Sequence, residues 1–339
     1  MMLFPRFLIL STLAFSQFTA SLNITRSKPH AALAPSPLPP SHAHSDGEAI
    51  ITAFQTLGRT TPWTWVQNIT FEGDTYEPEG IVRLGADRYI VSAGEYTAPT
   101  VPYNKTINGT DRTAGAGFAH LIVFGGDGSR IADATVTREG DIEYHNGGLD
   151  WDGENLWGAI AQYRPNSTAY VYKADPTTLE PKTVVHYDDH LGGVVHDKTL
   201  NSITALNWGS RNATTWHLHP HSPPSAPATP VRNPSFYIDY QDCKFLGHSP
   251  TYSGRPIMLC GGVSTLVSNG NVFYLGGIAL VDVEMMVPVS EVPITLTSAR
   301  GVPLTQNPID ASVSKEGSLR LYLLPDQRES TLYVIEASG

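Results

Sequence analysis

A short motif with two adjacent glycines occurs twice in the chain, each time at the start of an apolar, β-forming segment. The first copy is His145-Asn146-Gly147-Gly148-Leu149-Asp150, and the second is His190-Leu191-Gly192-Gly193-Val194-Val195. In each copy a polar start leads into a strand of small residues, a tight turn and a more apolar strand. Paired glycines let inner strands crowd around a common axis, so the repeat favours a β-propeller over a β-sandwich.

Weaker copies of this pattern begin near Glu79, Cys243 and Pro308. Their starts are spaced irregularly by about 45 to 70 residues, which suits propeller blades with loop insertions. We therefore expect an all-β fold of about five blades, with six as the alternative count. The strand predicted over Trp63–Phe71 would complete the last blade and close the ring, which removes exposed sheet edges.

The N-terminal part of the chain divides into three predicted segments. Arg6 precedes an apolar run over 7–15, which is typical of a signal peptide, so residues 1–20 are interpreted as one. Residues 21–44, rich in Pro, Ser and Ala, are predicted to form a flexible extension before the propeller domain of residues 45–339. A capping-box pattern at Ser45 and Glu48 predicts one short helix at the start of that domain.

Two further features indicate an oxidising compartment and a secreted glycoprotein. The only cysteines, Cys243 and Cys260, are expected to form one disulfide, worth about 3 kcal/mol on loop-entropy grounds. Six Asn-X-Ser/Thr sequons are candidate N-glycosylation sites. They begin at Asn23, Asn68, Asn104, Asn108, Asn166 and Asn212.

Charge and missing motifs exclude several classes of function. The formal net charge is −10 and no basic cluster occurs, so we expect neither nucleic acid nor a membrane as a partner. The chain has no Gly-x-Ser-x-Gly elbow, no His-Glu-x-x-His motif and no P-loop. The expected partner is a small molecule.

Polar residues at the starts of the predicted inner strands are the candidate site residues. Because function in propellers usually lies at one mouth of the central channel, these residues from different blades could converge there. The alternative is that each one caps a turn of its own blade. The set consists of Glu79, His145, Asn146, Asp188, Asp189, His190, Asn207, Asp242 and Asp310.

Aromatic and cationic residues follow the same blades. Tyr163-Arg164 and Trp208-Gly209-Ser210-Arg211 stand where strands run out into loops. An arginine beside an aromatic wall suits a flat, apolar ligand with an acidic or enolic group. The sequons at Asn166 and Asn212 follow these pairs, and glycans there would face solvent. The alternative is therefore that the pairs lie on the rim of a pocket and not on its floor.

No metal or cofactor is predicted. His217, His219 and His221 alternate in what reads as a mobile loop, which lacks the pinned geometry that zinc needs. Calcium at the axis is the better metal hypothesis, because three residues offer hard oxygen ligands, although the spacing of a known calcium loop is absent. These residues are Glu79, Asn146 and Asp310.

Four motifs give the chain a resemblance to a fungal and bacterial family of uncharacterised β-propeller domains, over roughly residues 62–337. In overall build the chain also resembles the secreted hetero-Diels–Alderases of fungal tropolone sesquiterpenoid pathways. The motifs are His145-Asn146-Gly147-Gly148-Leu149-Asp150-Trp151-Asp152-Gly153, Gln162-Tyr163-Arg164-Pro165, Asp189-His190-Leu191-Gly192-Gly193 and Asn207-Trp208-Gly209-Ser210-Arg211.

The second resemblance implies a cofactor-free cycloaddition, in which a hydroxymethyl tropolone loses water and the resulting quinone methide is captured by a humulene-type alkene. Under that hypothesis His145, His190, Arg164 and Arg211 take the polar catalytic roles. Glu79, Trp151, Tyr163 and Trp208 would bind substrate. The alternatives are a calcium-dependent lactonase or hydrolase and a non-catalytic secreted binding propeller.

Overall fold

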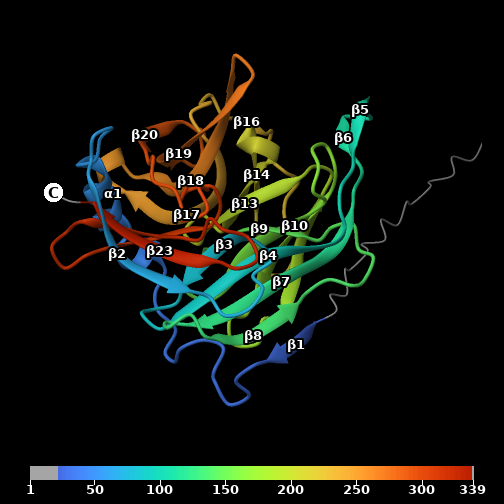
Figure 1. Cartoon of the computed structure of the whole chain (residues 1–339), viewed down its shortest axis with the longest axis horizontal. Coiled ribbons are helices and arrows are strands. Elements are labelled where there is room, and N and C mark those ends of the chain that lie inside the picture. The colour runs from blue at the N-terminus through green and yellow to red at the C-terminus, as the bar shows by residue number, and fades with distance from the viewer. Residues whose placement is uncertain (1–21, 338–339) are drawn as a thin grey trace, which may run out of the picture.

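In the computed structural model, which describes residues 22–337, the main strands form five antiparallel sheets arranged as the blades of a β-propeller (Figure 1). Each blade contains four strands, and blade 1 carries a fifth on its outer edge. The predicted all-β, five-bladed fold with one helix is therefore confirmed. No helix within the described residues is long and apolar enough to cross a membrane.

The strands of the five blades, given from the axis outward, have the following bounds. Blade 1 contains β3 (Glu77–Arg83), β4 (Arg88–Ala98), β7 (Ala116–Gly125), β8 (Arg130–Thr135) and β1 (Asn23–Arg26). Blade 2 contains β9 (His145–Trp151), β10 (Leu156–Ala161), β11 (Ala169–Ala174) and β12 (Pro181–Tyr187). Blade 3 contains β13 (Leu191–Asp197), β14 (Ser202–Asn207), β15 (Asn212–His217) and β16 (Val231–Arg232).

Blade 4 contains β17 (Asp239–Ser249), β18 (Arg255–Ser268), β19 (Asn271–Asp282) and β20 (Pro288–Pro293). Blade 5 contains β21 (Ile309–Val313), β22 (Leu319–Leu323), β23 (Thr331–Ala337) and β2 (Trp63–Thr70). The remaining elements are the hairpin β5 (Pro102–Ile107) and β6 (Thr110–Arg112), the helix α1 (Gly47–Gln55) and three 3-10 turns. These turns are η1 (His42–His44), η2 (Trp208–Ser210) and η3 (Pro250–Tyr252).

Blade 5 closes the ring with strands from the two ends of the domain. β2 pairs antiparallel with β23, from Trp63 opposite Ala337 to Thr70 opposite Thr331. This pairing confirms the predicted role of the Trp63–Phe71 segment.

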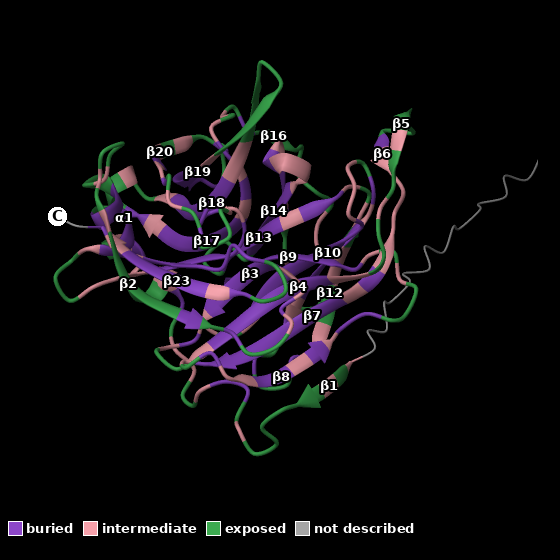
Figure 2. Cartoon of the chain, viewed as in Figure 1, coloured by how far each residue is buried: buried purple, intermediate pink, exposed green. Residues whose placement is uncertain are grey.

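The paired glycines allow the inner strands to approach each other closely, as the repeat predicted. A Cβ atom on Gly147 would lie 2.2 Å from the carbonyl oxygen of Gly192 in the next blade. A Cβ atom on Gly148 would lie 2.8 Å from Oδ1 of Asp242 in β17. Figure 2 shows the inner strands as the buried centre of the molecule.

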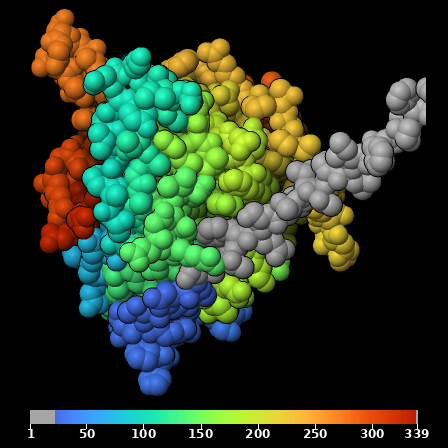
Figure 3. Space-filling model, turned by 90° about the vertical axis from the view of Figure 1, so that its right-hand side faces the viewer, coloured from blue at the N-terminus to red at the C-terminus, as the bar shows by residue number. Residues whose placement is uncertain are grey.

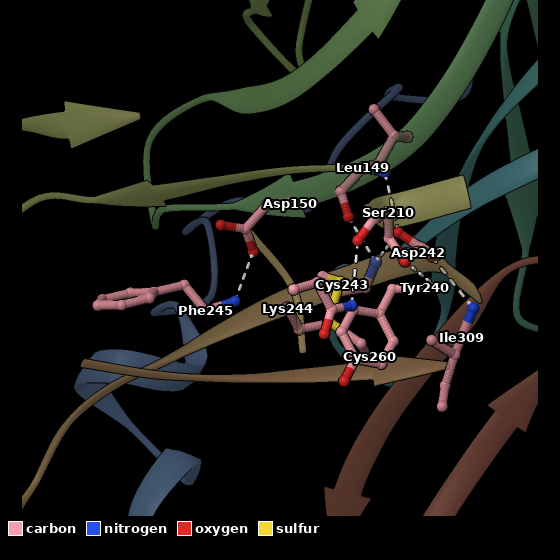
Figure 4. The surroundings of a disulfide bond; sticks show 11 residues. Leu149, Asp150, Ser210, Tyr240, Asp242, Cys243, Lys244, Phe245, Cys260 and Ile309 are labelled. Carbon is pink, nitrogen blue, oxygen red and sulfur yellow. Dashed lines mark hydrogen bonds and ion pairs between the residues drawn. A yellow bond between two sulfur atoms is a disulfide. The ribbon is translucent and has the colours of Figure 1, made fainter. Parts of the chain in front are cut away.

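The carboxylate of Asp242 joins the blades at the axis (Figure 4). It accepts hydrogen bonds from the backbone N–H groups of Ile81 at 3.2 Å, Leu149 at 3.0 Å and Ile309 at 3.1 Å. These residues belong to blades 1, 2 and 5, while Asp242 itself belongs to blade 4. A second carboxylate, Asp150 in blade 2, accepts from His196 in blade 3 and from Phe245 in blade 4.

Lys244 supplies the balancing charge. Its Nζ lies 2.7 Å from Oδ1 of Asp242 and donates to the carbonyl oxygen of Leu149, and both charged side chains are buried. Burial raises the pKa of Asp242 to about 6, although Lys244 opposes this shift. The axis is therefore filled by a fully bonded ion pair.

The predicted disulfide lies beside this ion pair. Cys243 and Cys260 are directly opposite each other on β17 and β18, and their sulfur atoms are bonded (Figure 4). Disulfides of this kind form in oxidising compartments.

The segment before the propeller departs from the prediction. The predicted signal peptide lies outside the described residues. Residues 22–44, which were predicted to be flexible, pack against the propeller. β1 pairs with β8, and Leu33 and Ala34 are buried in the blade 1 and blade 2 core. The blue N-terminal chain covers one end of the body in Figure 3.

The same segment packs against the lower mouth of the propeller, which is the end of the central channel where the inner strands end. His42 contacts Asp310 at 3.0 Å and Asp46 at 2.7 Å, and these two carboxylates raise its pKa to about 10 against the effect of burial. Apolar burial and this ion pair offset the disorder that the composition alone favours.

The predicted capping box is wrong, although the helix exists. α1 begins at Gly47 after Asp46, and no side chain caps it. The Ser45 hydroxyl donates to the carbonyl oxygen of Ser41, while the Glu48 carboxylate accepts from Thr251 in blade 4. A local contact of Ser45 and a tertiary contact of Glu48 therefore take the two side chains that would have formed the box.

We predict that Asp242→Ala lowers the free energy of unfolding by about 3–5 kcal/mol, because it leaves Lys244 buried without its counter-ion. Urea unfolding followed by circular dichroism measures this loss. Glu154→Ala is the matched control, since it breaks the exposed pair with Lys198 and should cost less than about 1 kcal/mol. Equal losses in the two variants would contradict the proposed importance of the axial carboxylate.

Candidate functional site

Four titratable side chains from three blades meet at the upper mouth, where the inner strands begin. Glu77 is the first residue of β3, and Glu79 lies at a β-bulge of that strand, where its carboxylate stays within 4.8 Å of the ligand atoms of Glu77 and His145. His145 is the first residue of β9, and His190 stands directly before β13. The predicted convergence of Glu79, His145 and His190 is thus present in the structure.

These four side chains are close neighbours, but the distances between their polar atoms are too long for hydrogen bonds. Nδ1 of His145 lies 3.8 Å from the Glu77 carboxylate, and Nε2 lies 4.0 Å from the Glu79 carboxylate. Nδ1 of His145 is buried and has no hydrogen-bond partner among the described residues. The His145 and His190 rings are 5.7 Å apart. A small polar group could therefore enter between the carboxyl groups and His145.

Burial keeps all four groups toward their uncharged forms. It raises the pKa of Glu77 to about 7, although the amide of Gln327 donates to this carboxylate at 2.8 Å. Burial and the neighbouring Glu77 charge raise the pKa of Glu79 well above its usual range. Burial also lowers the pKa of His145 to about 3 and that of His190 to about 4.

The tautomer of His190 follows from its contact with the backbone. Its Nδ1 lies 2.8 Å from the carbonyl oxygen of Gln162, which can only accept, so Nδ1 carries the hydrogen. Because the ring is neutral, Nε2 is left as a hydrogen-bond acceptor and base. The neighbouring Trp208 ring lies 4.8 Å from the His190 ring, edge to face.

An aromatic roof covers this cluster. The Tyr163 ring lies 4.7 Å from His145 and 5.5 Å from Trp208. Tyr96 meets Tyr163 edge to face at 5.6 Å, and its hydroxyl donates to the Glu77 carboxylate. We use the name aromatic roof for Tyr96, Tyr163 and Trp208.

Three residues with predicted roles either lie away from this cluster or use their polar groups in hydrogen bonds to other parts of the protein. Trp151 is the last residue of β9, so it stands at the opposite end of the strand from His145, and its indole N–H donates to Pro39 in the N-terminal segment. Nε of Arg164 donates to the Gln162 side chain. Arg211 uses its guanidinium to bond Gly209, Ser235 and Asp239 at the junction of blades 3 and 4.

The residues proposed for calcium do not share one site. The amide of Asn146 donates to His120 and accepts from Tyr172, and Asp310 contacts His42 and the backbone of Arg83 at the lower mouth. A different group could hold a divalent ion. Glu77, Glu79 and His145 each offer a ligand atom, and these atoms lie within 4.8 Å of one another.

Five sequon asparagines are exposed, and Asn212 is half-buried at the start of β15. The histidines at 217, 219 and 221 are exposed in a loop of blade 3. Sequon occupancy stays a prediction.

The fold and the cluster together define a five-bladed propeller with a buried acid–histidine site under an aromatic roof. Residues 38–338 match the DUF6454 family, a family of unknown function, and the chain belongs to it. No curated protein matches the sequence.

Solved structures that resemble the chain include the luciferin-regenerating enzyme, at 11% identity and a TM-score of 0.43, over 80% of this chain and 96% of that one. The Malassezia sympodialis allergen Mala s 1 matches at 11% identity and a TM-score of 0.42, over 79% of this chain and 82% of that one. The WD40 β-propeller domain of Doa1 matches at 10% identity and a TM-score of 0.39, over 81% of this chain and 97% of that one. At these values none of them indicates a substrate or reaction for this chain.

We predict that Glu77→Gln changes how stability depends on pH. The pKa of Glu77 is about 7 in the folded protein and 4.5 ordinarily, so between these values only the folded state keeps the proton. Stability from this group is present at low pH and is lost as the pH rises through about 7. Urea unfolding at about pH 5 and pH 8 should show a smaller decline in the variant than in the wild type. The exposed Glu316→Gln is the control, and identical pH profiles for wild type and Glu77→Gln would contradict the prediction.

Proposed function

We propose that this protein is an enzyme that binds a small, flat, largely apolar molecule under the aromatic roof and promotes loss of water from it by proton transfer. In its specific form, the reaction is the cofactor-free hetero-Diels–Alder cycloaddition of a tropolone quinone methide with a humulene-type alkene. The observation that carries the proposal is the meeting of Glu77, Glu79, His145 and His190 beneath aromatic rings.

The side chains present are suited to the dehydration step. Glu79, held protonated by burial, donates its proton to the leaving hydroxyl as the C–O bond breaks and water departs. Nε2 of His190 accepts the proton of the ring hydroxyl, and the electrons of that O–H bond form the quinone methide. His145, which lies between the two groups, returns the proton to Glu79 and restores the starting state.

The cycloaddition itself needs no further proton or electron. New C–C and C–O bonds form as the alkene adds across the quinone methide, so the protein has only to hold the two partners together. Proximity of this kind can lower a barrier by several kcal/mol, roughly 7–11 in favourable cases. The faces of Tyr163 and Trp208 are suited to hold flat, apolar rings.

We further propose that the enzyme works as a secreted glycoprotein. The disulfide supports an oxidising compartment, and the exposure of five sequon asparagines is compatible with glycosylation.

We predict that His190→Ala slows formation of the adduct from a hydroxymethyl tropolone and humulene by about a hundredfold, because the base is lost. His145→Ala should also slow turnover while the protein stays folded. Product formation is measured by chromatography with mass detection, and circular dichroism checks the fold. The exposed His217→Ala is the matched control. Full activity in both site variants, or no adduct with the wild type, would contradict the proposal.

A second candidate function is a metal-dependent hydrolase, such as a lactonase. The observation that favours it is the Glu77, Glu79 and His145 group, whose buried oxygen and nitrogen atoms could bind a divalent ion. Such an ion would polarise an ester carbonyl and activate a water molecule.

Removal of metal separates the two functions. The cycloaddition should keep its rate after exhaustive chelation with EDTA, because proton transfer and proximity need no ion. Loss of lactone hydrolysis on chelation, with recovery on adding calcium or zinc, would instead support the hydrolase. Glu79→Gln should lose activity under either function, because it removes a ligand of the proposed metal ion and also removes the proposed acid.

A further inference from the structure

An arginine that the sequence analysis did not single out lies over the aromatic roof. Arg112, the last residue of β6, places its guanidinium carbon 5.1 Å from the Trp208 ring centre and 5.7 Å from the Tyr163 ring centre. Such stacking over aromatic faces is favourable for a planar cation. Arg112 thus brings a guanidinium to the roof, whereas the guanidinium groups of Arg164 and Arg211 are bonded to other protein groups.

The β5–β6 hairpin is held in place by blade 2. Nη1 of Arg164 donates to the carbonyl oxygen of Arg112 at 3.4 Å, and the amide of Asn166 donates to the carbonyl oxygen of Gly109 at 2.7 Å. Figure 3 shows this hairpin region (teal) against the green atoms of blade 2, and a groove of about 360 Å3 lies between the hairpin and the 162–168 loop. The position of Arg112 therefore depends on contacts with the loop that also carries Tyr163.

Arg112 keeps donor capacity for a ligand. Its Nε and Nη2 form a bidentate pair with the carboxylate of Asp111 at 2.8 and 2.9 Å, and both side chains are partly exposed to solvent. Nη1 has no acceptor among the described residues. An anionic oxygen at the edge of the roof could bond the Nη1 of Arg112 and gain a charge-assisted hydrogen bond.

The floor and the roof of the site differ in charge. The floor holds the carboxyl groups of Glu77 and Glu79, which would repel an anion whenever they ionise. The roof holds the Arg112 cation. A ring with one ionised oxygen and a neutral hydroxymethyl group therefore binds best with the ionised oxygen toward Arg112 and the hydroxymethyl group toward the carboxyl groups, and the proton that His190 accepts comes from a second ring hydroxyl.

We propose that Arg112 recognises the ionised oxygen of the substrate, so that the site selects flat rings carrying an acidic enol. This inference rests on the proposed function, whose substrate it orients. Arg112 is a substrate-binding residue in this scheme, and Arg164 is a positioning residue that acts through the Arg112 carbonyl.

The test compares two probes that differ in charge and by one methyl group: tropolone at a pH where it is ionised, and its O-methyl ether, which is neutral. Calorimetric titration of the wild type should show tighter binding of tropolone. Arg112→Met should weaken tropolone binding by about tenfold to a hundredfold and leave the ether nearly unchanged, since only the charged contact is lost. Arg112→Lys should recover part of the difference, because it keeps the charge but not the planar fork.

Arg59→Met, an exposed substitution in the turn after α1, is the matched control and should bind both probes as the wild type does. Three results would overturn the inference: no binding of tropolone by the wild type, an unchanged tropolone affinity in Arg112→Met, or equal weakening of both probes. The last result would mean that Arg112 only shapes the roof. If tropolone binding depends on Arg112 but no adduct forms with humulene, the proposed cycloaddition fails and the charge recognition stands.

Discussion

The carboxylate of Asp242 is the point on which the architecture depends. It lies on the axis, accepts backbone hydrogen bonds from blades 1, 2 and 5, and is neutralised by Lys244 from its own strand. The glycine pairs bring the inner strands close together, and one side chain, paired with Lys244, satisfies backbone donors of three blades.

The closely packed axis lies beneath the upper mouth. Glu79 and His145 are buried there, and burial is the first cause of the pKa shifts of both groups. The N-terminal segment adds to this isolation from the other side, where it covers the lower mouth. The chemistry proposed for the site therefore follows from the same crowding that holds the blades together.

The ring could be predicted from the sequence because its signal is local: two glycine pairs, each followed by β-forming residues. Glu77 could also have been considered, since it stands two residues before Glu79 on one strand, but the β-bulge at Glu79 means that alternation alone does not place the two side chains together. The packing of residues 22–44 and the position of Arg112 could not be predicted from the sequence. Both depend on contacts with distant residues. Arg112 ends the short hairpin strand β6, which the strand pattern did not predict. Arg164 and Arg211 stand beside aromatic residues in the sequence, but their guanidinium groups bond other residues.

The pairing of β2 with β23 sets an order on the assembly of the protein. A strand made early, at Trp63–Thr70, has to wait for the last strand of the chain before its edge is covered. During synthesis the first four blades can form while blade 5 remains open and β2 exposes an unpaired edge. Loss of the Thr331–Ala337 strand would therefore leave β2 without its partner and expose an edge far away in the sequence.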